Sequence, residues 1–161
     1  MLAFVVDYRW LVFVHIVGVL GFVMSHGVSM MVALRLRTER DRTRIAELLQ
    51  FSGTSVMASY VSLGVLLIGG VWAGFRLEWW DHGWIWVSLG VLVFMIVEMG
   101  AVARPYYQRL KEAVELRPSG VPRRSDEELD AMLRSRLPLL NTVLGYASLV
   151  FITWLMIWKP W

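Results

Sequence analysis

The sequence predicts an all-α fold: a four-transmembrane-helix bundle with its N- and C-termini on the extracytoplasmic side. Three observations lead to this prediction. Of the 161 residues, 57% are hydrophobic, which is more than a single water-soluble core of this size can bury. Four segments stay apolar over the roughly 20 residues that span a bilayer. Basic residues gather between these segments, and several of the nine Trp residues lie beside the predicted helix ends, as in the aromatic belts of membrane proteins.

The predicted spans cover residues 10–34, 52–75, 83–103 and 137–158 of a single integral membrane domain, residues 1–161. The first apolar segment is longer than the apolar core of a signal peptide and has no small-residue cleavage site after it, so we expect it to remain as the first helix. Glu98 is the only formal charge within the four spans.

Basic residues mark the predicted cytoplasmic loops, residues 35–51 and 104–136. Of the 16 Lys and Arg residues, only Arg9, Arg76 and Lys159 lie outside these loops. Basic loops stay on the cytoplasmic side of a membrane, so both termini are predicted to be extracytoplasmic. The formal charge of +3 is then a topology signal and does not indicate nucleic acid. The expected partner is the lipid bilayer.

Short-range signals predict where helices begin. Asp41 is a predicted N-cap, so that the second helix starts before its apolar span. Turn residues at 118–122 break the longer loop, and Ser125 with Glu128 has the spacing of a capping box that restarts a helix. Pro138 is expected to kink the entry to the fourth span.

Small residues predict where helices touch: Gly18, Gly21 and Ser25 in the first span, and Gly70 with Gly74 as a GxxxG motif in the second. These faces are compatible with a homodimer or a larger membrane complex. They can equally be satisfied within one chain.

The chain contains no cysteine, which excludes disulfides, thiolate nucleophiles, iron–sulfur clusters and covalent haem attachment. It also has no glycine-rich phosphate loop, GxSxG or HExxH motif. The remaining candidates for chemistry are the three histidines, Glu98 and the methionines.

His15 and His26 are 11 residues apart in the first span, so they share one helix face and stand ~16 Å apart along its axis. An imidazole in lipid is costly unless it is bonded, which makes each a candidate metal ligand. His82 opens the third span on the side where His15 lies, and two such imidazoles can hold a b-type haem iron. A structural hydrogen bond, or an interfacial turn at His82, is the alternative.

His26 lies at a depth close to that of Glu98 on the third span. A His–Glu pair there would serve as a proton relay, as a hydrogen bond that supports a metal ligand, or only as a structural hydrogen bond. Glu98 has the further option of extending to the membrane interface. His26 is also an alternative haem ligand.

Methionine thioethers bind Cu(I) and serve as axial haem ligands. Met24, Met30 and Met31 lie on the first span, and Met95 and Met99 lie one turn apart on the third. Methionine is also common filler in cores and on lipid-facing surfaces, and filler is the preferred interpretation.

The stretch Tyr8–Arg37, YRWLVFVHIVGVLGFVMSHGVSMMVALRLR, resembles the opening helix of a superfamily of small four-helix bacterial membrane proteins. Its members include the copper-resistance protein D domain, the HemJ-type protoporphyrinogen oxidases and uncharacterised integral membrane families. The shared feature is an early histidine, here His15, which in the HemJ-like branch is linked to b-type haem. The resemblance implies the bacterial cytoplasmic (inner) membrane.

Two functional hypotheses follow. The first is a membrane-embedded b-type haem protein in electron transfer or haem-linked redox chemistry, with His15 as one iron ligand and His82 or His26 as the other. Whether this would be a haem-dependent oxidoreductase or an electron carrier stays open. The alternative is a non-enzymatic protein, either a copper-handling permease or a structural subunit of a larger membrane complex.

Overall fold

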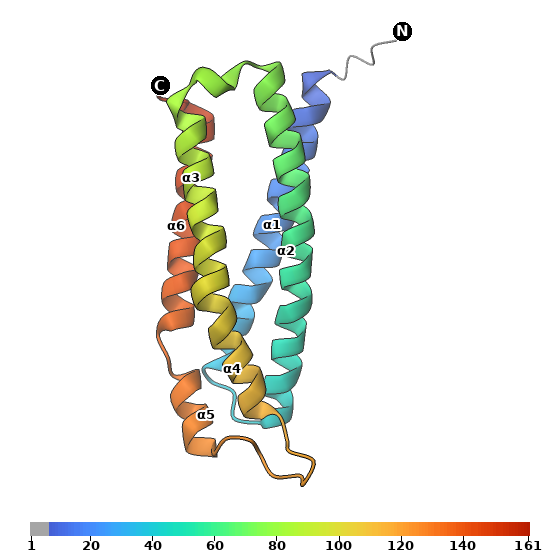
Figure 1. The fold of residues 1–161 in the computed structure, drawn as a ribbon, viewed down its shortest axis with the longest axis vertical. Coiled ribbons are helices and arrows are strands. Elements are labelled where there is room, and N and C mark those ends of the chain that lie inside the picture. Colours follow the sequence, from blue (N-terminus) through green and yellow to red (C-terminus); the bar gives the residue numbers. More distant parts are fainter. Residues whose placement is uncertain (1–6) are drawn as a thin grey trace.

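The protein is an all-α bundle, as its computed structural model shows for residues 7–161 (Figure 1). Within this part of the chain no strand forms, and an isolated bridge joins Leu116 and Pro122. Residues 1–6, and with them the N-terminal end, lie outside the description. The elements in chain order are α1 (Tyr8–Leu36), α2 (Arg42–Arg76), η1 (Trp79–Asp81), α3 (Gly83–Glu98), η2 (Met99–Ala103), α4 (Arg104–Val114), α5 (Asp126–Leu133) and α6 (Leu137–Trp158).

Four helical stretches of the described chain are long and apolar enough to cross a membrane: Tyr8–Leu36, Arg42–Arg76, Gly83–Val114 and Asp126–Trp158. Large apolar side chains are exposed along them, as at Met24, which is 72% exposed, and Phe75, which is 66% exposed. Because lipid solvates such surfaces as well as a protein core does, the bundle needs little apolar burial of its own. The predicted all-α four-helix architecture is therefore confirmed.

Helices α1 and α2 form a closely packed hairpin. A Cβ on Gly18 would clash with the backbone nitrogen of Leu66 and lie 2.7 Å from its Cα, and a Cβ on Gly69 would lie 2.6 Å from the backbone nitrogen of His15. Two helix backbones approach this closely only where side chains are absent. The predicted N-cap is also present, since the Asp41 carboxylate accepts hydrogen bonds from the backbone N–H groups of the first turn of α2.

The third long helix contains a π turn, η2, between α3 and α4. The backbone N–H of Arg104 donates to the carbonyl of Met99, five residues earlier. Pro105 follows directly, and proline has no N–H and collides with the carbonyl four residues before it. The wider turn relieves this collision, which gives the π turn a local cause in the sequence. π turns of this kind are frequent at functional sites.

Helix α5 begins with the predicted capping box. Ser125 Oγ accepts from the backbone N–H of Glu128, whose side chain accepts in return from the N–H of Ser125. The helix ends at Leu133, and α6 begins at Leu137 with Pro138 in its first turn, where the missing N–H has no intrahelical partner. The entry to the fourth span is thus a break between two helices.

The end of the bundle that carries the basic loops has its own apolar core. Arg42 connects α2 to α4 and to the start of α5. Its guanidinium donates to Asp126 Oδ1 at 2.7 Å, to the Ala113 carbonyl at 2.9 Å and to the Arg124 carbonyl at 2.8 Å. The Tyr106 hydroxyl donates to the Met132 carbonyl. The core, which sequence analysis did not predict, consists of Val32, Leu36, Ile45, Leu49, Leu110, Ala113, Val114, Leu129 and Leu133.

The opposite end holds a smaller cluster of Trp84, Ile85 and Leu155, with Trp79 packed against it. Lys159 Nζ lies 4.2 Å from the centroid of the Trp79 ring, a cation–π contact. The start of α1 and the C-terminus both lie at this end (Figure 1). Between the two ends, α2 packs mainly on α1 and α3 packs mainly on α6, so the bundle consists of two helix pairs.

We predict that Gly18→Ala destabilises the α1–α2 hairpin, because the added methyl group meets the backbone of Leu66. Overpacking of this kind costs about 1–3 kcal/mol of unfolding free energy. The melting temperature in detergent, followed by tryptophan fluorescence, should fall. Gly90→Ala is the matched control, since a Cβ there meets nothing within 4 Å. Equal melting temperatures for the two variants would contradict the close approach.

We predict a pH-dependent contribution from Glu39, which lies between α1 and α2. The backbone N–H of Arg40 donates to Glu39 Oε1 at 3.0 Å and that of Asp41 at 3.3 Å. These bonds, the one from Arg40 first, lower the pKa of the Glu39 carboxyl below its ordinary value of 4.5. A lowered pKa in the folded state means that ionisation stabilises the fold. This stabilisation is complete above the unfolded pKa and is lost as the pH falls through the folded pKa.

Glu39→Gln should therefore lower the melting temperature at neutral pH. The difference from wild type should shrink progressively below about pH 4. Melting curves of both proteins across the acid range check this. A difference that stays constant down to the lowest pH would show that the carboxylate charge is irrelevant.

Candidate functional site

Two cavities lie between the helix pairs. The apolar cavity has a volume of about 470 Å³ and is lined by α1, α2, η1, α3 and α6 toward the end where the C-terminus lies. The polar cavity has a volume of about 410 Å³ and is lined by α1, α2, α3, η2, α4 and α6 toward the basic loops. Both volumes fall in the range of roughly 300–1,000 Å³ that is typical of small-molecule sites.

His15 lines the apolar cavity, and its ring is fixed by α2. Its Nδ1 lies 2.8 Å from the carbonyl oxygen of Leu66. A carbonyl can only accept a hydrogen bond, so Nδ1 is the donor and carries the hydrogen. In the neutral ring this leaves a lone pair on Nε2, the state of an imidazole that ligates a metal.

Two neighbouring glycines make this geometry possible. Gly69 lets the α1 backbone at His15 approach α2, and a Cβ on Gly70 would lie 2.7 Å from His15 Nδ1. The two glycines of the predicted GxxxG motif have different neighbours. The first, Gly70, leaves room for the His15 imidazole. The second, Gly74, faces the Trp80 indole, whose nearest atoms would lie 3.2 Å from an added Cβ.

Two indoles of the apolar cavity, those of Trp80 and Trp84, have buried Nε1 groups for which the described residues provide no hydrogen-bond partner. A buried N–H without a partner is costly. The Trp84 side chain is fully buried and Trp80 Nε1 faces Gly74, so neither N–H is presented to the cavity. Lys159 lines the same cavity and is the charged side chain of a mainly apolar lining, which matches a ligand that is mostly apolar and carries an anionic group.

His82 lies apart from His15. It is exposed, it precedes the first residue of α3, and it is absent from the lining of the apolar cavity. His26 lines the polar cavity instead. The structure therefore places the three predicted ligands in three surroundings and brings no two of them into one cavity.

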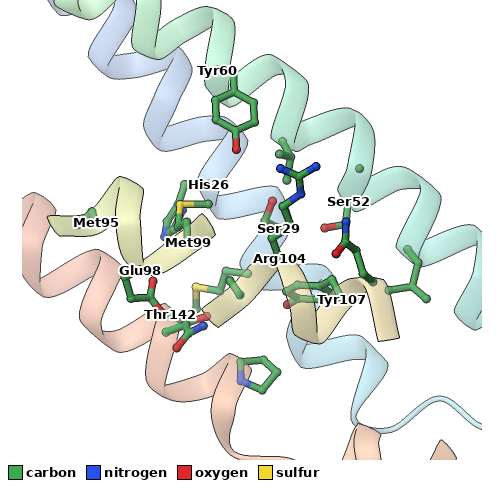
Figure 2. Close-up of a pocket in the computed structure, with 18 of the residues that line it drawn as sticks. His26, Ser29, Ser52, Tyr60, Met95, Glu98, Met99, Arg104, Tyr107 and Thr142 are labelled. Atoms are coloured by element: carbon green, nitrogen blue, oxygen red, sulfur yellow. The ribbon is translucent and has the colours of Figure 1, made fainter. Parts of the chain in front are cut away.

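Figure 2 shows the polar cavity, where His26 and Glu98 both lie. The sequence predicted that these two side chains lie at a similar depth in the membrane. In the structure both line the same cavity. No hydrogen bond joins them in the described structure, and His26 Nε2 is buried without a partner. Ser29, which also lines the cavity, bonds Ser55 across the α1–α2 interface at 2.8 Å.

The imidazole of His26 forms part of the wall between the cavities. It stacks on Phe22, which lines the apolar cavity, with ring centroids 6.1 Å apart. Its other neighbours are on α6: the Tyr146 ring is 5.6 Å away, and a Cβ on Gly145 would lie 2.6 Å from His26 Nε2. Gly145 therefore admits the ring, which sequence analysis did not recognise.

The methionines separate into two groups. Met24 and Met31 are 72% and 67% exposed on the lipid-facing side of α1, as expected for filler. Met30, Met95 and Met99 line the polar cavity beside His26.

A model of the DUF2269 family, described as predicted integral membrane proteins, matches residues 9–160. The chain belongs to this family. Membership agrees with the expected uncharacterised integral membrane family and with a multi-pass protein in lipid. No curated protein and no solved structure matches the chain.

Residues 7–161 contain no cluster of three or more His, Cys, Asp or Glu side chains that could hold a metal ion.

Several polar residues of the polar cavity were missed by sequence analysis. Arg104 and Lys111 had been interpreted only as topology signals. Their heptad spacing along α4, with Gln108 between them, was the available signal, because residues seven apart share a helix face. Which face meets the cavity depends on α2 and α6, which supply Tyr60, Asn141 and Thr142.

Proposed function

We propose that this protein is a membrane-embedded b-type haem protein that serves electron transfer or haem-linked redox chemistry. The observation that carries the proposal is the His15 imidazole, which lines an apolar cavity with its Nδ1 bonded to the Leu66 carbonyl. The hydrogen bond orients the ring and leaves Nε2 free to ligate. A backbone carbonyl on the second ring nitrogen is the usual partner of a metal-binding histidine.

The remaining lining fits the rest of such a cofactor. A porphyrin is a flat apolar ring with two carboxylates. Apolar side chains from four helices line the cavity, and they would exclude water from the ring faces. Lys159 lines the cavity, and its ammonium is a donor that a carboxylate requires.

The similarity of Tyr8–Arg37 to the opening helix of the HemJ-like branch adds independent support. A bound haem supplies an iron centre that exchanges single electrons. Further motifs of that branch in its later helices are missing here, so the oxidase reaction is not part of the proposal. His15 is the residue that would hold the iron. His82 and His26 lie outside the cavity lining and would become the second ligand only by moving.

We also place the protein in the bacterial cytoplasmic membrane with its basic loops inside. The arginine-rich end that contains α5 would face the cytoplasm, and the His15 cavity would lie in the outer half of the bilayer. The support is the distribution of basic residues and the shared end of the α1 start and the C-terminus.

The test is the absorption spectrum of protein purified from haem-sufficient cells. We expect a Soret band that shifts on reduction with dithionite, and we expect His15→Ala to abolish it. Gly70→Ala should weaken or shift the band, because the added methyl group displaces the ring from Leu66. His82→Ala is the matched control and should keep the band, since His82 is exposed.

A colourless protein that stays colourless after addition of haem would overturn the proposal. A full Soret band in folded His15→Ala, with a wild-type melting curve, would overturn the assignment of the ligand. Loss of the band in His26→Ala alone would move the site to the polar cavity.

A second candidate function is copper handling, which one observation favours. Met30, Met95 and Met99 converge with His26 in the polar cavity, and thioether and imidazole groups suit Cu(I). Near Gly145, the His26 ring and the Met95 methyl group lie close together, at 2.6 Å and 3.6 Å from the position of an added Cβ.

Elemental analysis after incubation with Cu(I) tests this candidate. Met95→Leu with Met99→Leu should lose most of the bound copper if the cavity holds it. Met24→Leu with Met31→Leu, which changes two lipid-facing methionines, should lose none. Equal copper in the two double variants would overturn the candidate. A protein with neither haem nor copper would favour a structural subunit.

A further inference from the structure

The strongest unassigned feature is positive charge at the rim of the polar cavity. Arg104 and Lys111 both line the cavity, and each is exposed at its edge. The two residues are seven apart on α4, so they share a helix face with Gln108 between them. In Figure 2 the Arg104 side chain points from α4 toward α2.

These two cations have no ion-pair partner within residues 7–161, whereas six arginines at the same end of the bundle have one. The paired arginines are Arg35, Arg40, Arg42, Arg123, Arg124 and Arg134. Glu98 lines the cavity as well but forms no ion pair with either cation. The charged lining therefore carries a net positive charge and is electrostatically complementary to an anion.

The facing surface of α2 leaves room for a ligand. Gly53, Val56 and Tyr60 share one face of α2 and line the cavity opposite Arg104 and Lys111. A Cβ on Gly53 would lie 3.9 Å from Lys111 Nζ, so the ammonium reaches across to α2 beside a residue with no side chain. Gly53 and Tyr60 are exposed while Ser52 is buried, so the cavity opens on the lateral surface of the bundle.

The position of this opening identifies the class of ligand. Arg104 directly follows the third apolar span, which itself contains Glu98. Arg104 therefore lies at the level of the lipid headgroups, where the charged ends of lysine and arginine side chains reside. A lateral opening at that level faces lipid rather than bulk water. The wall also contains apolar groups, including Val56, Ala103 and Pro138, which suit the start of an acyl chain.

We propose that the polar cavity binds one anionic phospholipid, with its phosphate between Arg104 and Lys111 and the start of its acyl chain against the apolar wall. Guanidinium and ammonium groups are the common phosphate ligands of proteins. This site is distinct from general attraction of basic loops to acidic membranes, because it uses two particular cations at a cavity. It does not rest on the haem assignment.

Native mass spectrometry of the detergent-purified protein with phosphatidylglycerol tests the proposal. We expect one tightly retained lipid per chain. Arg104→Gln with Lys111→Gln should weaken its binding at least about tenfold, the effect of losing one charge-assisted hydrogen bond or more. The matched control is Arg109→Gln with Arg117→Gln, which removes two charges outside the cavity lining and should leave the retained lipid in place.

A second pair of variants changes the space and keeps the charge. Gly53→Leu should reduce lipid retention by filling the cavity beside Lys111. Gly64→Leu, at an α2 position where a Cβ meets nothing within 4 Å, should not. Melting curves of both variants verify that they are folded.

Three results would overturn the proposal. The first is equal weakening by the cavity and control charge pairs, which would indicate general attraction to basic loops. The second is equal retention of phosphatidylcholine, which would remove the role of charge. The third is displacement of the lipid by inorganic phosphate at the same ionic strength as a chloride control, which would indicate a site for a soluble anion.

Discussion

The close approach of α1 and α2 is the constraint on which the rest of the structure depends. In lipid the helices gain little from burying apolar surface, so they associate through tight packing and hydrogen bonds. Gly18 and Gly69 bring the two backbones together, and Ser29 and Ser55 bond across the interface. This approach puts the His15 ring against the Leu66 carbonyl. An imidazole that would be costly in hydrocarbon is thereby satisfied on one side and free on the other.

Both cavities follow from the division of the bundle into two helix pairs. At one end an apolar core joins α1 and α2 to α4 and α5. At the other end, a tryptophan cluster on α3, α6 and η1 reaches α2 through the contact of Trp80 with Phe75. Between these ends the pairs meet where His26 of α1 contacts Tyr146 of α6. The apolar cavity is lined by His15 and mainly apolar side chains, whereas the polar cavity has two cations, Arg104 and Lys111, that form no ion pair with any described residue. Each therefore matches a different ligand.

Sequence reasoning was most accurate where the physics is local. The N-cap at Asp41 and the capping box at Ser125 are confirmed, because a cap depends on a side chain and backbone groups a few residues away. The predicted contacts at Gly18 and Gly21 do face α2, but the backbone of α2 approaches α1 at Gly69, and the predicted Gly70 and Gly74 face side chains instead. These partners were not predicted, because the sequence contains no information on which residue of α2 stands opposite Gly18. The apolar core at the basic end was missed for the same reason, since its members are distributed over four helices.

Solvent alone determined the architecture: four apolar segments of sufficient length must become helices in a bilayer, since each backbone polar group then finds its partner within its own segment. Equal depth along the membrane, such as that of His26 and Glu98, also follows from residue counting. Helix rotation and lateral neighbours do not, because many packings satisfy the same apolar pattern. Only the tertiary structure decided that His15 and His26 line different cavities, that His82 stands outside both, and that Arg104 and Lys111 share one rim.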